Sequence, residues 1–183
     1  MKRLLKGIIL TLVALVVVVV GGAYLIPPVA VVERTTVIAA SPDKVYAVIA
    51  SMKRFNEWSP WTDLDPGLTY TFEGPEQGPG QKMSWKSGNP QIGSGSVTIT
   101  EAVTNEKVTT ELDFGEMGKS QSVLTLSTVS GGTLVKWVFS AESNGILNRW
   151  VSLMFDSWIG GDYVKGLARL KALVESDAPA TDG

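Results

Sequence analysis

Between residues 68 and 142, apolar and polar positions alternate with a period of two, which is typical of half-buried β-strands. Clusters of Gly, Pro and Asn divide this region, and we expect six strands, at 68–73, 81–87, 96–103, 107–114, 119–129 and 133–142. The polar members of the alternation are mostly Ser, Thr, Lys and Glu, so one face of the sheet should contact water. The apolar face must then be covered by another part of the chain.

The segment before these strands predicts one more strand and two short helices. Residues 29–39 are rich in Val and Thr and are expected to form the first strand. Ser41, Pro42 and Asp43 indicate the start of a helix, because they suit the N-cap, the first helical position and the positive end of the helix dipole. A second short helix is expected over 53–58.

The last segment, 146–175, supplies the expected cover for the sheet. Its apolar positions recur with helical spacing. They are Leu147, Trp150, Val151, Met154, Trp158, Val164, Leu167, Ala168 and Val174. As one helix it would be ~45 Å long at ~1.5 Å per residue. Gly160 and Gly161 interrupt the pattern and are expected to kink the helix or split it.

The N-terminal region has the pattern of a membrane-spanning helix. Residues 7–26 contain no charged residue, and about 20 such residues suffice to cross the hydrocarbon core of a bilayer. Lys2, Arg3 and Lys6 precede them. This positive flank predicts a single-pass anchor in the cell membrane with a cytoplasmic N-terminus and an extracytoplasmic soluble domain.

Two other interpretations of this region stay open. A cleaved signal peptide usually has an apolar region of only ~7–15 residues, but a cleavage site can be placed after Ala23, with the small residue Gly21 at position −3. A buried helix of the domain itself is the other alternative, although the segment is long and uniformly apolar.

Length and charge set the domain organisation. We expect an anchor at 1–28, one domain at 29–176, and a flexible tail at 177–183. Beyond the anchor, 13 basic residues face 18 acidic ones, a net charge of −5. No basic stripe is present, which argues against a nucleic-acid surface. The oligomeric state is left open by the sequence.

The composition also restricts the available chemistry. The chain has no cysteine and no histidine, which excludes disulfides, thiol catalysis and the commonest general base and metal ligand. Residues 63–67 begin like a calcium loop, but the twelfth position is Gly74 where that motif needs Glu. We therefore predict no metal site, no cofactor and no catalytic set.

Four carboxylates are candidate acids or bases. Glu111 and Asp113 share the strand face that we assign to solvent. Asp156 and Asp162 flank Trp158 on the last helix, and one of them would act as an acid or base if it faced a cavity. Ordinary surface carboxylates are the alternative interpretation.

Several short motifs together resemble the START/polyketide-cyclase superfamily. They are Ser41-Pro42-Asp43-Lys44-Val45-Tyr46, Trp58-Ser59-Pro60-Trp61, Asp65-Pro66, Phe72-Glu73-Gly74-Pro75, Met83-Ser84-Trp85, Gly93-Ser94-Gly95, Gly132-Thr133-Leu134-Val135-Lys136-Trp137 and Gly166-Leu167-Ala168-Arg169-Leu170-Lys171. The resemblance covers about residues 30–175 and is closest to the polyketide cyclase/dehydrase group of bacterial proteins. It implies an α+β helix-grip fold, with a curved antiparallel sheet of about seven strands around a long C-terminal helix and an apolar cavity between them.

The apolar residues of the sheet and the last helix are the candidate cavity lining. They are Tyr70, Phe72, Met83, Trp85, Val97, Ile99, Leu112, Phe114, Val135, Trp137, Phe139, Trp150, Met154 and Trp158. A packed core is the alternative interpretation, since a domain of this size needs one, and the resemblance favours a cavity. Trp58 and Trp61 are expected to anchor the short helices to the sheet, with a position at the mouth of the cavity as the alternative.

Three functions follow as hypotheses. The first is a membrane-anchored binding protein for an apolar small molecule or lipid. The second is a cyclase or dehydratase acting on a polyketide-like substrate, with Tyr70 or Asp156 taking part. The third is a membrane-tethered domain that binds a protein partner through its surface.

Overall fold

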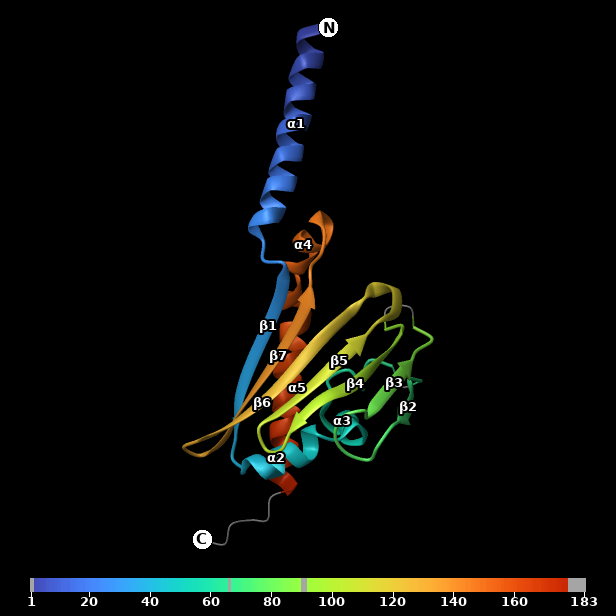
Figure 1. Ribbon diagram of the computed structural model, residues 1–183, viewed down its shortest axis with the longest axis vertical. Helices are drawn as coiled ribbons and strands as arrows, with labels where there is room; N and C mark the ends of the chain where they lie inside the picture. Colours follow the sequence, from blue (N-terminus) through green and yellow to red (C-terminus); the bar gives the residue numbers. More distant parts are fainter. Residues whose placement is uncertain (1, 66, 90–91, 178–183) are drawn as a thin grey trace.

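A computed structural model describes residues 2–65, 67–89 and 92–177. Three helices and one strand precede the β-meander, and two further helices follow it (Figure 1). In order they are α1 (Lys2–Leu25), β1 (Val29–Ile38), α2 (Pro42–Ile49), α3 (Met52–Trp58), β2 (Thr69–Glu73), β3 (Lys82–Lys86), β4 (Ser94–Val103), β5 (Lys107–Asp113), the 3₁₀ turn η1 (Gly115–Met117), β6 (Lys119–Val129), β7 (Gly132–Glu142), α4 (Ile146–Ser152) and α5 (Phe155–Asp177).

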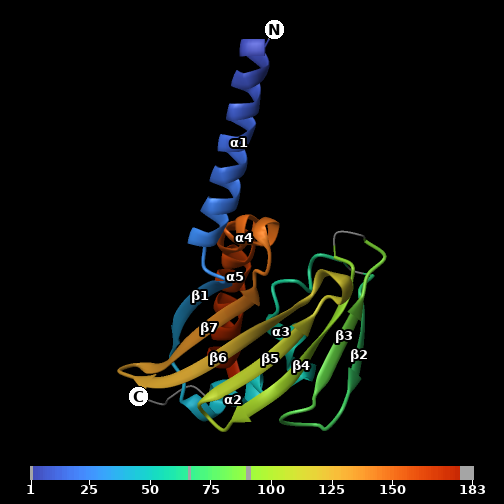
Figure 2. The ribbon, with the colours of Figure 1, turned by 45° about the horizontal axis from the view of Figure 1, so that its top comes forward.

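The seven strands form one antiparallel sheet in the order β1-β7-β6-β5-β4-β3-β2. Consecutive strands pair from β2 to β7, and β1 closes the other edge by pairing with β7, where Val29 lies opposite Glu142 and Ile38 opposite Thr133. The sheet curves around α5, with α2 and α3 at one end (Figures 1 and 2). This architecture confirms the expected α+β helix-grip fold, and the strand boundaries agree with the sequence prediction to within two residues.

The period-two pattern decides which side chains enter the core. On β7, Thr133, Val135, Trp137 and Phe139 are buried, and the residues between them are only half-buried. One register shift interrupts the meander, between Ile99 and Glu101 on β4. Such a β-bulge increases the local twist, which helps the sheet to wrap the helix.

The C-terminal segment differs from its prediction in where it breaks. The helix ends at Ser152 and restarts at Phe155, and α5 continues through Gly160 and Gly161 without interruption. Gly160 permits a close approach, because a Cβ there would overlap the guanidinium of Arg34 from β1.

A second glycine of α5 serves the same purpose against the sheet. A Cβ on Gly166 would lie 2.7 Å from the indole ring of Trp137. Real Cβ atoms do not approach other heavy atoms so closely, so this glycine lets the helix sit directly on β7. The glycines are therefore packing positions within a regular helix.

The buried face of α5 agrees only in part with the expected one, since Leu167 and Val174 are buried as expected and Ala168 is exposed. The residues that enter the core are Tyr163, Gly166, Leu167, Leu170 and Val174, whereas Val164 is exposed. The break after Ser152 separates α4 from α5, so one helical period does not run through both. Helix α4 packs against α1, and its apolar residues Leu147 and Trp150 are exposed.

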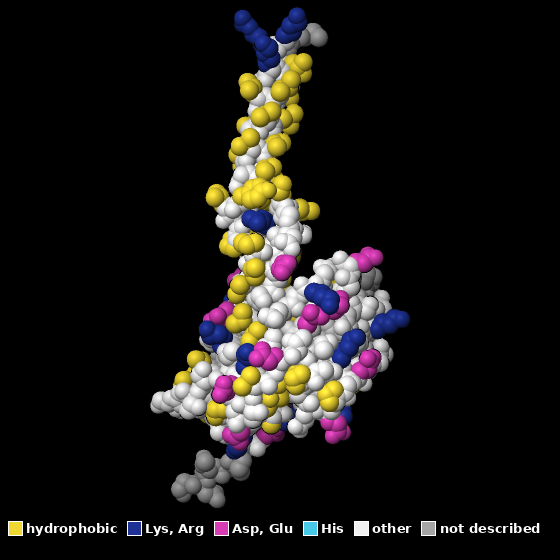
Figure 3. Space-filling view, viewed as in Figure 1, with side chains coloured by type: hydrophobic (Ala, Val, Ile, Leu, Met, Phe, Trp, Pro, Cys, Tyr) yellow, Lys and Arg dark blue, Asp and Glu magenta, His cyan; other side chains and the backbone are white. Residues whose placement is uncertain are grey.

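The sequence predicts an anchor at the N-terminal end of the chain and a flexible tail at the C-terminal end. Among the described residues, α1 is the one helix long and apolar enough to cross a membrane, a property that an N-terminal signal sequence shares. Hydrophobic side chains cover it, with Lys and Arg at its N-terminal end (Figure 3). At the other end α5 includes Asp177, which pairs with Arg54 at 3.0 Å. The rest of the expected tail, 178–183, lies outside the described residues.

Candidate ligand cavity

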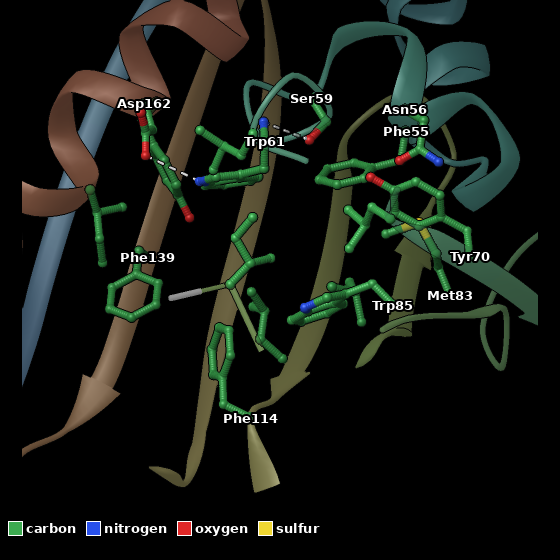
Figure 4. Close-up of a pocket in the computed structure, with 17 residues that line it drawn as sticks. Phe55, Asn56, Ser59, Trp61, Tyr70, Met83, Trp85, Phe114, Phe139 and Asp162 are labelled. Carbon is green, nitrogen blue, oxygen red and sulfur yellow. Dashed lines mark hydrogen bonds between the residues drawn. The ribbon is translucent and has the colours of Figure 1, made fainter. Parts of the chain in front are cut away.

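A cavity of about 380 Å³ lies between the concave face of the sheet and helices α3 and α5 (Figure 4). Its volume falls in the range of about 300–1,000 Å³ that is common for small-molecule sites. The side chains that line it are mostly apolar. They are Phe55, Asn56, Ser59, Trp61, Leu64, Leu68, Tyr70, Met83, Trp85, Ile92, Val97, Leu112, Phe114, Phe139, Ile159, Asp162 and Tyr163.

Three neighbouring strands build the sheet wall of the cavity. Met83 of β3 lies opposite Val97 of β4, and Val97 lies opposite Leu112 of β5. Directly opposed residues of an antiparallel sheet point to the same face. The three side chains therefore form a continuous apolar row, which the alternation in the sequence already placed on one face.

Two aromatic side chains, Trp85 and Phe114, pack against each other at one end of this wall. Trp85 packs edge-on against Phe114, with ring centroids 5.7 Å apart. Trp85 also lies over Gly95 of the neighbouring strand, where any Cβ would overlap the indole ring and approach the Asp113 carbonyl oxygen to 2.7 Å. Gly95 thus fixes the position of a cavity residue without lining the cavity itself.

The helix wall carries a side-chain hydrogen bond. The indole Nε1 of Trp61 donates to Oδ2 of Asp162 at 3.1 Å, and the Trp61 backbone N–H is within 3.3 Å of Ser59 Oγ (Figure 4). The bond joins the loop after α3 to α5, and both residues face the cavity. Of the two candidate carboxylates on the last helix, Asp162 therefore lines the cavity. Asp156 instead pairs with Arg34 at 2.8 Å and is mostly exposed.

A buried aromatic cluster supports the helix wall from behind. The rings of Trp137 and Tyr163 stack with centroids 3.7 Å apart and planes inclined by 14°. The Trp137 indole donates to Ser122 Oγ at 2.7 Å, and the Tyr163 hydroxyl lies 3.5 Å from the same oxygen. Burial raises the pKa of the Tyr163 phenol far above its usual value, so this group stays neutral. Tyr163 therefore contributes a neutral, rigidly held ring to the wall.

Few polar groups face the cavity, and one of them is unpaired. Asn56 Oδ1 is one of three buried side-chain polar atoms among the described residues that have no hydrogen-bond partner. Tyr70 lies nearby with its ring toward the cavity (Figure 4). Burial, and to a lesser extent the charge of Asp65, raises the pKa of its hydroxyl. A ligand with a hydrogen-bond donor would satisfy the Asn56 oxygen.

Half of the fourteen candidate cavity residues line this cavity. They are Tyr70, Met83, Trp85, Val97, Leu112, Phe114 and Phe139. Ile99, Val135 and Trp137 lie on the same face but are fully packed in the core, because α2 and α5 cover that part of the sheet. Phe72 is 42% exposed near the β2 edge.

The three helix candidates lie away from the cavity. Trp150, Met154 and Trp158 are on the surface around the α4–α5 junction, since the break there turns them away from the sheet. The residues of α5 that do line the cavity are Ile159, Asp162 and Tyr163. Helical spacing alone does not predict them, because the face that α5 turns to the sheet is set by the contacts of Gly160 with Arg34 and of Gly166 with Trp137.

The remaining lining residues come from α3 and from loops. They are Phe55, Asn56, Ser59, Trp61, Leu64, Leu68 and Ile92. Leu68 begins the strand expected at 68–73, and the others belong to no period-two pattern in the sequence. Trp61 was expected to anchor the helices, and it both does so and faces the cavity. No group of three acidic side chains that could hold a metal ion occurs in the described part of the chain.

Comparison with known proteins gives one family match and several similar solved structures. Residues 29–175 match the family described as polyketide cyclase/dehydrase and lipid transport. Similar solved structures include a protein from Chromobacterium violaceum, with 20% identity and a TM-score of 0.54, covering 81% of this chain and 99% of that one. A protein of unknown function from Staphylococcus aureus has 12% identity and a TM-score of 0.61, covering 81% and 94%.

A further similar structure is the di-domain ARO/CYC StfQ from the steffimycin biosynthetic pathway. It has 12% identity and a TM-score of 0.59, covering 81% of this chain and 51% of that one. At such identities the likeness shows the fold alone. No match was found among curated protein sequences.

Proposed function

Because this chain belongs to the polyketide cyclase/dehydrase and lipid transport family, we propose that it is a membrane-anchored protein that binds an apolar small molecule or lipid in the cavity beneath α5. The observation that carries the proposal is the cavity of about 380 Å³, walled by Met83, Val97 and Leu112. Burying a ligand against such a surface gains about 25 cal/mol per Å² of apolar area.

The polar groups define the ligand more closely. Asn56 Oδ1 is an acceptor without a donor, and Asp162 contributes a carboxylate at the helix wall. A mainly apolar molecule with a hydroxyl or amide donor would suit either group. A molecule with a free carboxylate would meet the Asp162 charge unfavourably.

Helix α1 supplies the location in this proposal. We infer that it is retained as an anchor, with residues 7–26 in the bilayer, the N-terminus in the cytoplasm and residues 29–177 on the outer side. An apolar ligand is concentrated in the membrane, so tethering the cavity there raises the rate at which ligand is met.

A second candidate is an enzyme of the cyclase or dehydratase type. It is favoured by one observation, that Asp162 lies beside the apolar cavity and accepts a hydrogen bond from Trp61. Such a carboxylate is a candidate general base toward a substrate held against Leu112.

Native mass spectrometry of the full chain, expressed in cells and released from lipid nanodiscs, tests the proposal. We expect a reproducible added mass that resolves into a lipid or other apolar metabolite. If the mass stays that of the bare chain, even after incubation with a total lipid extract, the binding proposal fails. A ligand whose mass changes by one water during incubation would favour the enzyme.

A further inference from the structure

The surface around the α4–α5 junction is unusually apolar. Its members have exposed fractions between 38% and 74%. They are Leu147, Trp150, Leu153, Met154 and Trp158, and we refer to them as the junction patch. Large aliphatic and indole side chains at this exposure indicate a surface that is covered in the working protein.

The junction patch is continuous with the end of α1. The indole Nε1 of Trp150 donates to the Val19 carbonyl at 3.1 Å. The Trp150 ring also packs so closely on Gly22 that a Cβ there would lie only 2.8 Å from it. The Trp150 ring therefore lies against the last turns of the helix that would occupy the bilayer. A tryptophan at this depth, with an apolar ring and one bonded N–H, is typical of a membrane interface.

Arg149 fixes the angle between α1 and α4. Its guanidinium Nη1 donates to the carbonyl oxygens of Ala23 and Ile26, at 3.2 and 3.1 Å, and it lies 5.4 Å from the centre of the Tyr24 ring. The carbonyl groups at the C-terminal end of a helix have no partners within the helix, and a cation there also complements the helix dipole. The patch is thus held beside α1 rather than free to turn away.

Polar groups mark the boundary of the patch on the side of the domain. Asp156, in the first turn of α5, pairs with Arg34 at 2.8 Å. An apolar surface with Arg149 on one side and this ion pair on the other has the layout of an element that lies in a membrane surface. A second protein would need a polar pattern to match, whereas lipid tails need none.

We propose that the junction patch inserts into the outer surface of the bilayer that α1 spans, so that the protein contacts the membrane at two points. This inference rests on the proposed anchor. Because Arg149 and Trp150 hold the domain against α1, the second contact restrains the tilt of the whole protein relative to the bilayer, which a single spanning helix would leave free.

The strand register shows what this restraint does for the cavity. Val29, where β1 leaves the anchor, lies opposite Glu142, and Ala141 beside it lies opposite Ser120, just after the β5–β6 turn. Phe114 at that turn lines the cavity. The cavity end that carries Phe114 therefore shares the sheet end where α1 attaches (Figures 1 and 2), and an inserted patch keeps it near the lipid surface.

The chain has no cysteine, so single cysteines can carry a polarity-sensitive NBD label. We would label L153C in the patch, L12C within α1 and S130C at the far β6–β7 turn, each in the full chain in phosphatidylcholine/phosphatidylglycerol vesicles. All three positions are exposed. Quenching by nitroxide-labelled lipid then reports contact with the bilayer.

The proposal expects L12C and L153C to be quenched several-fold more than S130C. Quenching of L12C alone would overturn the second contact and leave the anchor standing. A blue-shifted L153C label that lipid does not quench would indicate cover by a second copy or another protein, and would also overturn it. If L12C is not quenched, the anchor fails and the inference fails with it. Ligand binding is read separately by native mass spectrometry on the same labelled proteins.

Discussion

Leu112→Trp is expected to lower the affinity for the cavity ligand by about 100-fold, or about 2.8 kcal/mol. Leu112 is half-buried on β5 and its side chain faces the cavity between Val97 and the helix wall. An indole at this position would occupy space that the ligand needs. The domain should stay folded, because the cavity of about 380 Å³ has room for the larger ring.

The measurement is the amount of ligand carried per mole of purified protein, by mass spectrometry of its organic extract. Val123→Trp is the matched control, since Val123 lies on β6 with its side chain on the opposite face of the sheet. We expect the control to carry ligand like the original chain. Equal ligand in the Leu112→Trp protein, with its fold intact, would show that the ligand does not occupy this cavity.

Gly166→Ala is expected to destabilise the domain by about 2 kcal/mol, although alanine is the better helix former. The new methyl group would lie 2.7 Å from the Trp137 ring and 3.2 Å from Pro60. Trp137 has little freedom to move, because it stacks on Tyr163 and its indole N–H is bonded to Ser122. The cost of overpacking should therefore exceed the gain in helix propensity.

Gly161→Ala is the matched control in the same helix. No atom lies within 4 Å of the position of its Cβ, so only the propensity gain remains. We expect stabilisation by about 0.5–1 kcal/mol. Urea unfolding of the full chain in detergent micelles measures both variants. Two changes of the same sign would contradict the close helix–sheet contact at Gly166.

The strands could be predicted from the sequence because their signal is local. Alternation such as that of Val135, Trp137 and Phe139 needs only one buried face, and Gly131 and Gly132 mark the turn before it. The same alternation does not distinguish a residue that lines the cavity from one that is packed in the core. Ile99 and Val97 share a face, but Ile99 lies in the packed core and Val97 faces the cavity, and only the position of the helices decides this.

The helix side of the cavity could not be predicted from periodicity. Gly160 was expected, with Gly161, to kink or split the helix, but Gly160 and Gly166 are contact points whose partners, Arg34 and Trp137, are far away along the chain. Trp150 and Met154 have helical spacing, but Trp150 lies on α4, where it contacts α1, and Met154 lies in the turn between α4 and α5. Long-range partners, and not propensity, set these positions.

Photolabelling tests the central claim, that an apolar ligand occupies the space between the sheet and α5. The full chain in vesicles would be irradiated with a diazirine-bearing hexadecanol, digested, and mapped by mass spectrometry. We predict adducts on Met83, Val97 and Leu112, which face the cavity, and their loss when excess unlabelled hexadecanol is added. Adducts confined to α1 and the junction patch would contradict the account, because they would show that the probe meets the protein only through the bilayer.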